Sequence, residues 1–229
     1  PMEHTASHAT ASIYGYWSAS GRTGYRWYFR PGLGIGTIPT NGGEMCVFAS
    51  VRPQEFHKRR AEGLERLFRE TVRRADPTLA EELEGAPPSG ALRGFAGVPG
   101  FLRRSVGPGW ALVGDAGYFK DPLTAHGISD AFRDSELLAN SIVRGNNEAL
   151  EDYQSARNAA AQGLMDVTDR IASLAWTTDE VKGLHRTLSR EMNVGVEVIE
   201  AFDTGGSALD EGASIRPARS APGGKPAVA

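Results

Sequence analysis

The stretch "GWALVGDAGYFKDPLTAHGISDAFRDSELLA", residues 109–139, holds the local pattern from which the fold can be worked out. The apolar run "WALVG" ends at Gly114-Asp115, a loop follows, and a helical pattern begins at Gly127. A short run that is apolar throughout is typical of a strand buried on both faces. We therefore predict a buried strand at 110–114, a connecting loop, and a long helix over 127–144.

The helix predicted over 127–144 carries both apolar and charged residues, and apolar side chains usually face the core. The expected inward residues are Ile128, Ala131, Phe132, Ser135, Leu138, Ala139 and Ile142. The expected outward residues are Asp130, Arg133, Asp134 and Glu136. In the loop before the helix, we expect Lys120 and Asp121 to be solvated or paired with each other.

Asp115 lies at the carboxyl end of the predicted strand, where open α/β sheets place their ligand crevices. The N-terminus of the following helix has unpaired N–H groups and carries a partial positive charge. Gly127 has no Cβ, so a flat ligand can approach the backbone there. This combination suits a polyhydroxylated ligand that ends in a delocalised electron acceptor.

The run "ALVGDAGYFKDPLTAHGISDAFRDSELLA" resembles the second flavin-binding motif of the single-component FAD-dependent monooxygenases, the family built like p-hydroxybenzoate hydroxylase. Asp115, Pro122 and Gly127 stand where that motif has its Asp, its Pro and its helix-opening Gly. The resemblance implies that Asp115 binds the ribityl hydroxyls of FAD and that Pro122 lies on the flavin face. It also implies that the N–H groups of Ile128 and Ser129 face the pyrimidine edge of the flavin. The cofactor-binding residues so implied are Gly114, Asp115, Pro122, Gly127, Ile128 and Ser129.

The rest of the chain predicts an α+β (α/β) fold. Strand patterns separated by turn residues predict an antiparallel meander, and longer amphipathic patterns predict helices. The expected strands are 11–19, 25–29, 33–39 and 44–51, and the expected helices are 55–75, 147–176 and 178–192. We expect an antiparallel-sheet substrate region over 1–106, the C-terminal part of an FAD-binding domain with helices over 107–202, and a mobile Gly/Pro/Ser-rich tail over 203–229.

Three aromatic residues, Tyr25, Trp27 and Phe29, share one face of the second predicted strand, because alternate side chains of a strand point the same way. By the resemblance, this sheet forms the substrate chamber, so these residues are candidates for binding an organic substrate. Packing of the sheet against a helix explains the same pattern equally well.

The sequence departs from the family pattern in several places. The G-x-G-x-x-G that holds the FAD pyrophosphate is absent, and "GLGIGTIP" at 32–39 leads into a strand instead of opening a helix. The Asp-Gly motif from the middle of the family is also absent. We expect both to lie before residue 1, so that the chain is part of a larger protein. Within the motif, many relatives have a glycine near Thr124 and a histidine where this chain has Tyr118.

Composition narrows the function classes. The net charge of −3 at pH 7 and the pI near 6.0 give no general affinity for nucleic acid. No apolar run reaches the length of a membrane span, so no integral membrane segment is predicted. Cys46 is the single cysteine, which fits a cytoplasmic location, and its position within a strand favours packing. The histidines lack metal-ligand spacing and G-x-S-x-G is absent, so we predict no metal site and assign no catalytic residue.

The resemblance implies an FAD-dependent oxidoreductase, for which we favour a monooxygenase. In such an enzyme NAD(P)H reduces FAD, O₂ adds to the flavin as a C4a-hydroperoxide, and oxygen passes to a small organic substrate. Three alternatives stay open: a flavin-dependent reductase of isoprenoid double bonds, a flavin-dependent halogenase, and a non-catalytic binding module that keeps the fold.

Overall fold

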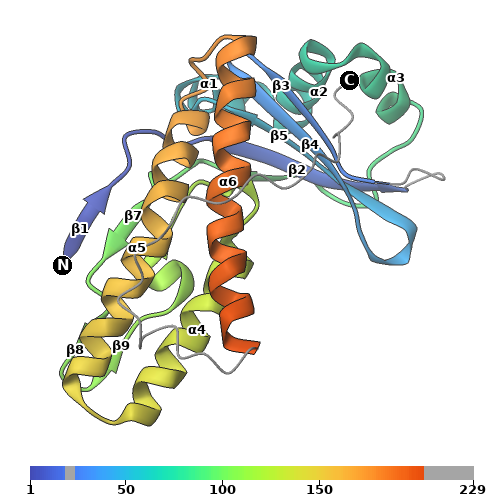
Figure 1. Cartoon of the computed structure of the whole chain (residues 1–229). Helices are drawn as coiled ribbons and strands as arrows, with labels where there is room; N and C mark the ends of the chain where they lie inside the picture. Colours follow the sequence, from blue (N-terminus) through green and yellow to red (C-terminus); the bar gives the residue numbers. More distant parts are fainter. Residues whose placement is uncertain (19–23, 204–229) are drawn as a thin grey trace.

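The computed structural model describes residues 1–18 and 24–203 (Figure 1). It combines antiparallel sheets with long helices, which confirms the predicted α+β class. The tail predicted to be mobile lies outside the described residues, except for residue 203.

A five-stranded antiparallel sheet occupies the first half of the chain. Its order is β3-β4-β5-β2-β6. A simple meander would place β2 beside β3, whereas here β2 lies beside β5. β2 pairs with β5 along its full length, from Ala11↔Val51 to Ser18↔Glu44. The strands are β2 (Ala11–Ser18), β3 (Arg26–Arg30), β4 (Leu33–Pro39), β5 (Glu44–Val51) and β6 (Arg93–Phe95).

Helices cover both faces of this sheet (Figure 1). One face packs on α1 (Pro53–Arg59), α2 (Leu64–Ala75) and α3 (Pro77–Glu84) through a core that includes Trp17, Ile35 and Phe68. The helix predicted over 55–75 is divided, because Gly63 at φ 104° separates α2 from the short 3₁₀ turn η2 (Arg60–Glu62).

The opposite face packs on α5 (Asn147–Ala172) and α6 (Thr178–Asp203), which extends beyond the predicted end at 192. Phe29 and Phe48 of the sheet contact a helical core that includes Leu164, Trp176 and Leu184. Phe29 and Tyr28 therefore point to opposite faces, as strand alternation predicts, since Tyr28 packs on the α2 side.

Two small sheets lie beside the long helices, and the first strand of the chain joins one of them. β1 (Met2–Thr5), β7 (Phe101–Arg103) and β10 (Tyr118–Phe119) form one, and β8 (Val106–Gly107) with β9 (Trp110–Ala111) forms a hairpin. α4 (Gly127–Arg144) lies antiparallel to α5, and it begins and ends where the sequence predicts. No helix within the described ranges has the length and apolar character to cross a membrane.

The prediction of a strand at 110–114 that is buried on both faces is wrong. Only Trp110 and Ala111 of "WALVG" are in a strand, Trp110 is exposed, and residues 111–113 are half-buried. The prediction assumed a strand inside an α/β sheet with both faces covered, whereas within the described residues β9 forms only a two-stranded hairpin with β8.

The predicted orientation of α4 is also wrong. Asp130, Arg133 and Asp134, expected to face solvent, are each at most 2% exposed. The apolar residues expected inside are largely exposed: Ile128 at 77%, Phe132 at 71% and Ile142 at 61%. The inward side of α4 is therefore charged in its first half, where Asp130, Arg133 and Asp134 form ion pairs within the fold, while Leu137 and Ser141 are buried in its second half.

The two phenylalanines Phe68 and Phe132 provide a test of this arrangement. Phe68 is buried and stacks on Trp17 with ring centroids 5.1 Å apart, so Phe68→Ala is expected to lower the free energy of unfolding by about 3–5 kcal/mol. Phe132→Ala, on the exposed side of α4, is expected to change it by less than about 1 kcal/mol. Urea unfolding followed by circular dichroism measures both, and similar losses for the two variants would contradict the orientation of α4.

Candidate functional site

The Gly-Asp pair of the predicted motif forms a tight turn, the 3₁₀ element η3 (Gly114–Ala116). Gly114 has φ 52°, and its N–H donates to Asp134 Oδ2 at 3.2 Å. A Cβ placed on Gly114 would lie 2.9 Å from the Cβ of Ala131, so this turn packs directly on α4. Asp115 is exposed beyond it.

The N-terminus of α4 lies beside Asp115. A Cβ placed on Gly127 would be 3.6 Å from Asp115 Oδ1, so a glycine leaves open space between the carboxylate and the first helical turn. The residue before the helix, His126, makes no side-chain capping hydrogen bond. Ile128 and Ser129 are exposed in the first turn. The structure thus brings a free carboxylate together with the positive end of a helix.

The turn that begins at Pro122 contacts the sheet through the next residue, Leu123. Pro122 is exposed at the start of this 3₁₀ turn, η4 (Pro122–Thr124), and Leu123 is buried. Leu123 Cδ1 lies 3.2 Å from the Cβ position of Gly34 in β4. The six predicted cofactor-binding residues lie along the segment that runs from η3 to the start of α4. This segment contacts, through Leu123, the face of the sheet that carries Phe29 and Phe48.

The predicted substrate residues have different surroundings. Trp27 stacks on Phe29 with centroids 6.5 Å apart and meets Phe48 edge-on at 5.4 Å. Phe29 also contacts Trp176 and His185 of the helical layer, with centroid distances of 6.0 Å and 4.4 Å. Tyr25 is 70% exposed. Phe29 is thus mainly a packing residue, while Trp27 remains partly open to solvent.

Lys120 and Asp121 are neither solvated nor paired with each other, contrary to expectation. Both are buried, and Lys120 Nζ contacts Asp130. Asp121 accepts hydrogen bonds from the N–H of Thr10 at 2.6 Å and of Leu123 at 3.0 Å. Burial raises the pKa of Asp121 and lowers that of Lys120, because each charge is removed from water. Asp121 therefore anchors the loop to the start of β2.

Sequence reasoning missed the residues that hold the loop on the helix. Arg133 donates to Asp130 Oδ1 and to Asp134 Oδ1, both at 2.9 Å. The signal that could have revealed them is the spacing of 130, 133 and 134, which places two carboxylates and a guanidinium on one side of a helix.

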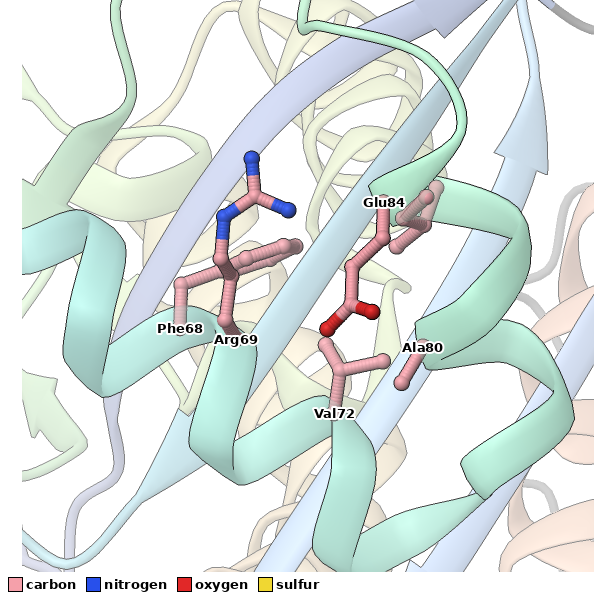
Figure 2. Close-up of a pocket in the computed structure, with 6 residues that line it drawn as sticks. Phe68, Arg69, Val72, Ala80 and Glu84 are labelled. Atoms are coloured by element: carbon pink, nitrogen blue, oxygen red, sulfur yellow. The ribbon is translucent and has the colours of Figure 1, made fainter.

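A small gap between α2 and α3 lies far from this region in the chain (Figure 2). Its volume is about 10 Å³, room for about one water molecule, and its lining includes Phe68, Val72 and Ala80. Figure 2 shows the side chains of Arg69 and Glu84 at its edge. The gap is too small to hold an organic substrate.

The fold of this chain is similar to parts of several solved flavin-dependent enzymes. The flavin-dependent brominase Bmp2 superposes with a TM-score of 0.61 at 15% identity, over 86% of this chain and 56% of that one. CmlS, a flavin-dependent halogenase, gives 0.61 at 16% identity, over 96% and 42%. HpxO of Klebsiella pneumoniae, solved with FAD and uric acid, gives 0.57 at 15% identity, over 88% and 52%.

At these identities the similarity establishes the fold. The chain spans about half the length of these proteins, from 42% of CmlS to 56% of Bmp2. No protein-family model and no curated protein matches the sequence.

Substitution of Gly114 tests the close packing of the Gly-Asp turn. Gly114→Ala is strained both by the positive φ and by the contact with Ala131, whereas Gly109→Ala meets only the strain of its φ of 78°. We expect Gly109→Ala to cost about 1–2 kcal/mol and Gly114→Ala about 1–3 kcal/mol more, measured by urea unfolding. Equal losses would show that η3 does not press on α4.

The pKa of His126 gives a prediction about pH. Burial, with help from the charges of Lys120 and Arg133, lowers this pKa from 6.5 to about 4. The unfolded chain therefore binds a proton at His126 between pH 6.5 and 4 that the folded chain does not, and stability falls as the pH is lowered through this window. We expect His126→Gln to lose less stability than the wild type between pH 7 and pH 5 in urea unfolding. His57→Gln, on the exposed side of α1, is the control and should follow the wild type.

Proposed function

We propose that this chain supplies the isoalloxazine- and ribityl-binding half of an FAD site in a flavin-dependent oxidoreductase. The observation that carries the proposal is the position of the Asp115 carboxylate beside the uncapped first turn of α4 at Gly127. A carboxylate accepts hydrogen bonds from hydroxyl groups, and a helix N-terminus stabilises negative charge on a carbonyl. Both properties match the parts of FAD that the sequence motif implies.

The residues present fit this part of FAD and leave the rest of the cofactor unexplained. Asp115 would bind ribityl hydroxyls, and the N–H groups of Ile128 and Ser129 would face the ring edge. Gly127 leaves space for the ring, and Pro122 would lie on its face. The sequence contains no G-x-G-x-x-G motif for the pyrophosphate. We infer that a dinucleotide-binding half, on further polypeptide, completes the site.

The exposed side of α4 supports the existence of such a half. Ile128, Phe132, Ile142 and Val143 are all more than 60% exposed along one side of the helix. Several large apolar side chains exposed on one side of a helix suit contact with another protein layer. The structural neighbours, about twice as long as this chain, have the length to contain that layer.

When bound, FAD would supply redox chemistry with NAD(P)H as reductant and O₂ as oxidant, and we favour monooxygenation of a small organic substrate. This chain's residues would bind the ring, stabilise charge on it through α4, and keep water from the buried side of the loop. Trp27, partly exposed on the sheet face that Leu123 contacts, is the candidate for substrate contact.

A halogenase is the second candidate, because two of the neighbours named above are a brominase and a halogenase. Both reactions consume O₂, and a halogenase also requires a halide ion. Oxygen uptake and product mass, measured with and without bromide or chloride, would distinguish them in a polypeptide that contains both halves of the site.

Flavin binding tests the proposal directly. We expect the 229-residue chain to bind FAD with a Kd well above 1 μM, because the pyrophosphate and adenosine contacts are missing from it. In a polypeptide with both halves, Asp115→Ala should weaken FAD binding by about tenfold or more, since a charged hydrogen-bond acceptor is lost. Flavin fluorescence quenching measures both constants. Asp152→Ala, on the exposed side of α5, is the control, and submicromolar binding by this chain alone would overturn the half-site interpretation.

A further inference from the structure

We propose that Asp134 is a positioning residue, which holds the Gly114–Asp115 turn on α4 so that Asp115 and the helix N-terminus face the same ligand. The positioning itself is a property of this chain, and its consequence for a flavin rests on the function proposed above. The hydrogen bonds of the Asp134 carboxylate go to Gly114 and to Arg133, so Asp134 acts through these neighbours.

A hydrogen bond joins the Asp134 side chain to the Gly114–Asp115 turn. Asp134 Oδ2 accepts the N–H of Gly114 at 3.2 Å, one residue before Asp115. The other oxygen, Oδ1, accepts from Arg133 Nη2 at 2.9 Å. Both oxygens of this buried carboxylate are thus engaged, one by the turn and the other by the helix that carries it.

A second connection fixes the middle of the same loop. Lys120 Nζ contacts Asp130, and Asp130 Oδ1 accepts from Arg133 Nη1 at 2.9 Å. Arg133 therefore bridges the two carboxylates that hold the loop, one near its start and one near its middle. These four side chains are buried and balance two positive charges with two negative ones.

Helix α5 adds a third connection to the loop. Arg157 donates from Nη1 to the carbonyl of Gly117 at 3.0 Å, and the hydroxyl of Tyr118 donates to the carbonyl of Ala161 at 3.2 Å. The segment after Asp115 is therefore held by α5, whereas Gly114 is held by Asp134 of α4. Loss of Asp134 should release the turn at Asp115 and leave the segment at 117–118 in place.

Amide hydrogen exchange, measured by NMR on the 229-residue chain, tests the positioning. In Asp134→Ala, the Gly114 and Asp115 amides should exchange about tenfold faster relative to the Tyr118 amide and the central amides of α5, because the acceptor of Gly114 is lost. Asp134→Asn keeps an oxygen that can accept from Gly114, so it should restore part of the protection. Asp152→Ala removes an exposed ion pair with Arg144 and should leave both amides unchanged.

Two results would overturn the proposal. One is faster exchange of equal size throughout α4 and α5, which would show that Asp134 only stabilises the fold. The other is unchanged exchange of Gly114 in Asp134→Ala. If the alanine variant does not fold, the asparagine variant is used instead. The exchange of the Gly114 and Asp115 amides relative to those of Tyr118 and α5 then decides whether Asp134 positions the turn or only stabilises the fold.

A titration with millimolar FAD separates this proposal from the proposed function. In the wild type we expect chemical-shift changes at Asp115 and at Gly127, Ile128 and Ser129. In the less disruptive Asp134→Asn, those at the helix should persist and that at Asp115 should shrink by at least half. Absence of any shift in the wild type would overturn flavin binding, while the exchange ratios would still decide on Asp134. Equal shifts at Asp115 in both proteins would overturn the role of Asp134 toward the ligand.

Discussion

The buried guanidinium of Arg133 is the constraint on which the arrangement of this region depends. It is 1% exposed and joins Asp130 to Asp134, which in turn bind Lys120 and the N–H of Gly114. A buried ion is strongly destabilising when it loses its partner, so these four side chains must be buried together. The rotation of α4 about its axis follows from this requirement, and with it the approach of the Gly-Asp turn to the helix.

That rotation determines which surface α4 presents to its surroundings. With the charges directed into the fold, the apolar residues at 128, 132, 142 and 143 point away from it. A helix with a charged inner side and an apolar outer side is suited to lie between two layers of a protein, one on each side. The described residues supply the inner layer through the loop and α5, and the proposed dinucleotide-binding half would supply the outer one.

Sequence patterns predicted the positions of the helices and strands better than they predicted which sides of these elements are buried. The ends of α4 follow from Gly127 and Gly145, and four of the five strands of the large sheet, β2 to β5, follow from local alternation and turn residues. The rule that apolar residues point inward failed for α4, because it assumes one core and cannot foresee that Lys120, ten residues before Asp130, will neutralise that carboxylate. It failed for "WALVG" because a run of apolar residues does not reveal what lies on either side. The proximity of Asp115 to Gly127 was predicted from the motif, whereas the part of Asp134 in it required the three-dimensional structure.

The charge of Asp115 also bears on what the helix N-terminus can bind. A free helix N-terminus is a common site for phosphate, because its N–H groups and partial positive charge favour an anion. Here the Asp115 carboxylate lies close to Gly127 and offsets part of that charge, which makes this helix N-terminus less favourable for the singly charged phosphates of a dinucleotide. A ligand with hydroxyl groups toward Asp115 and a delocalised, weakly charged ring toward Ile128 and Ser129 avoids this unfavourable interaction. In the proposed FAD site, this pair would therefore suit the flavin end of the dinucleotide better than its pyrophosphate.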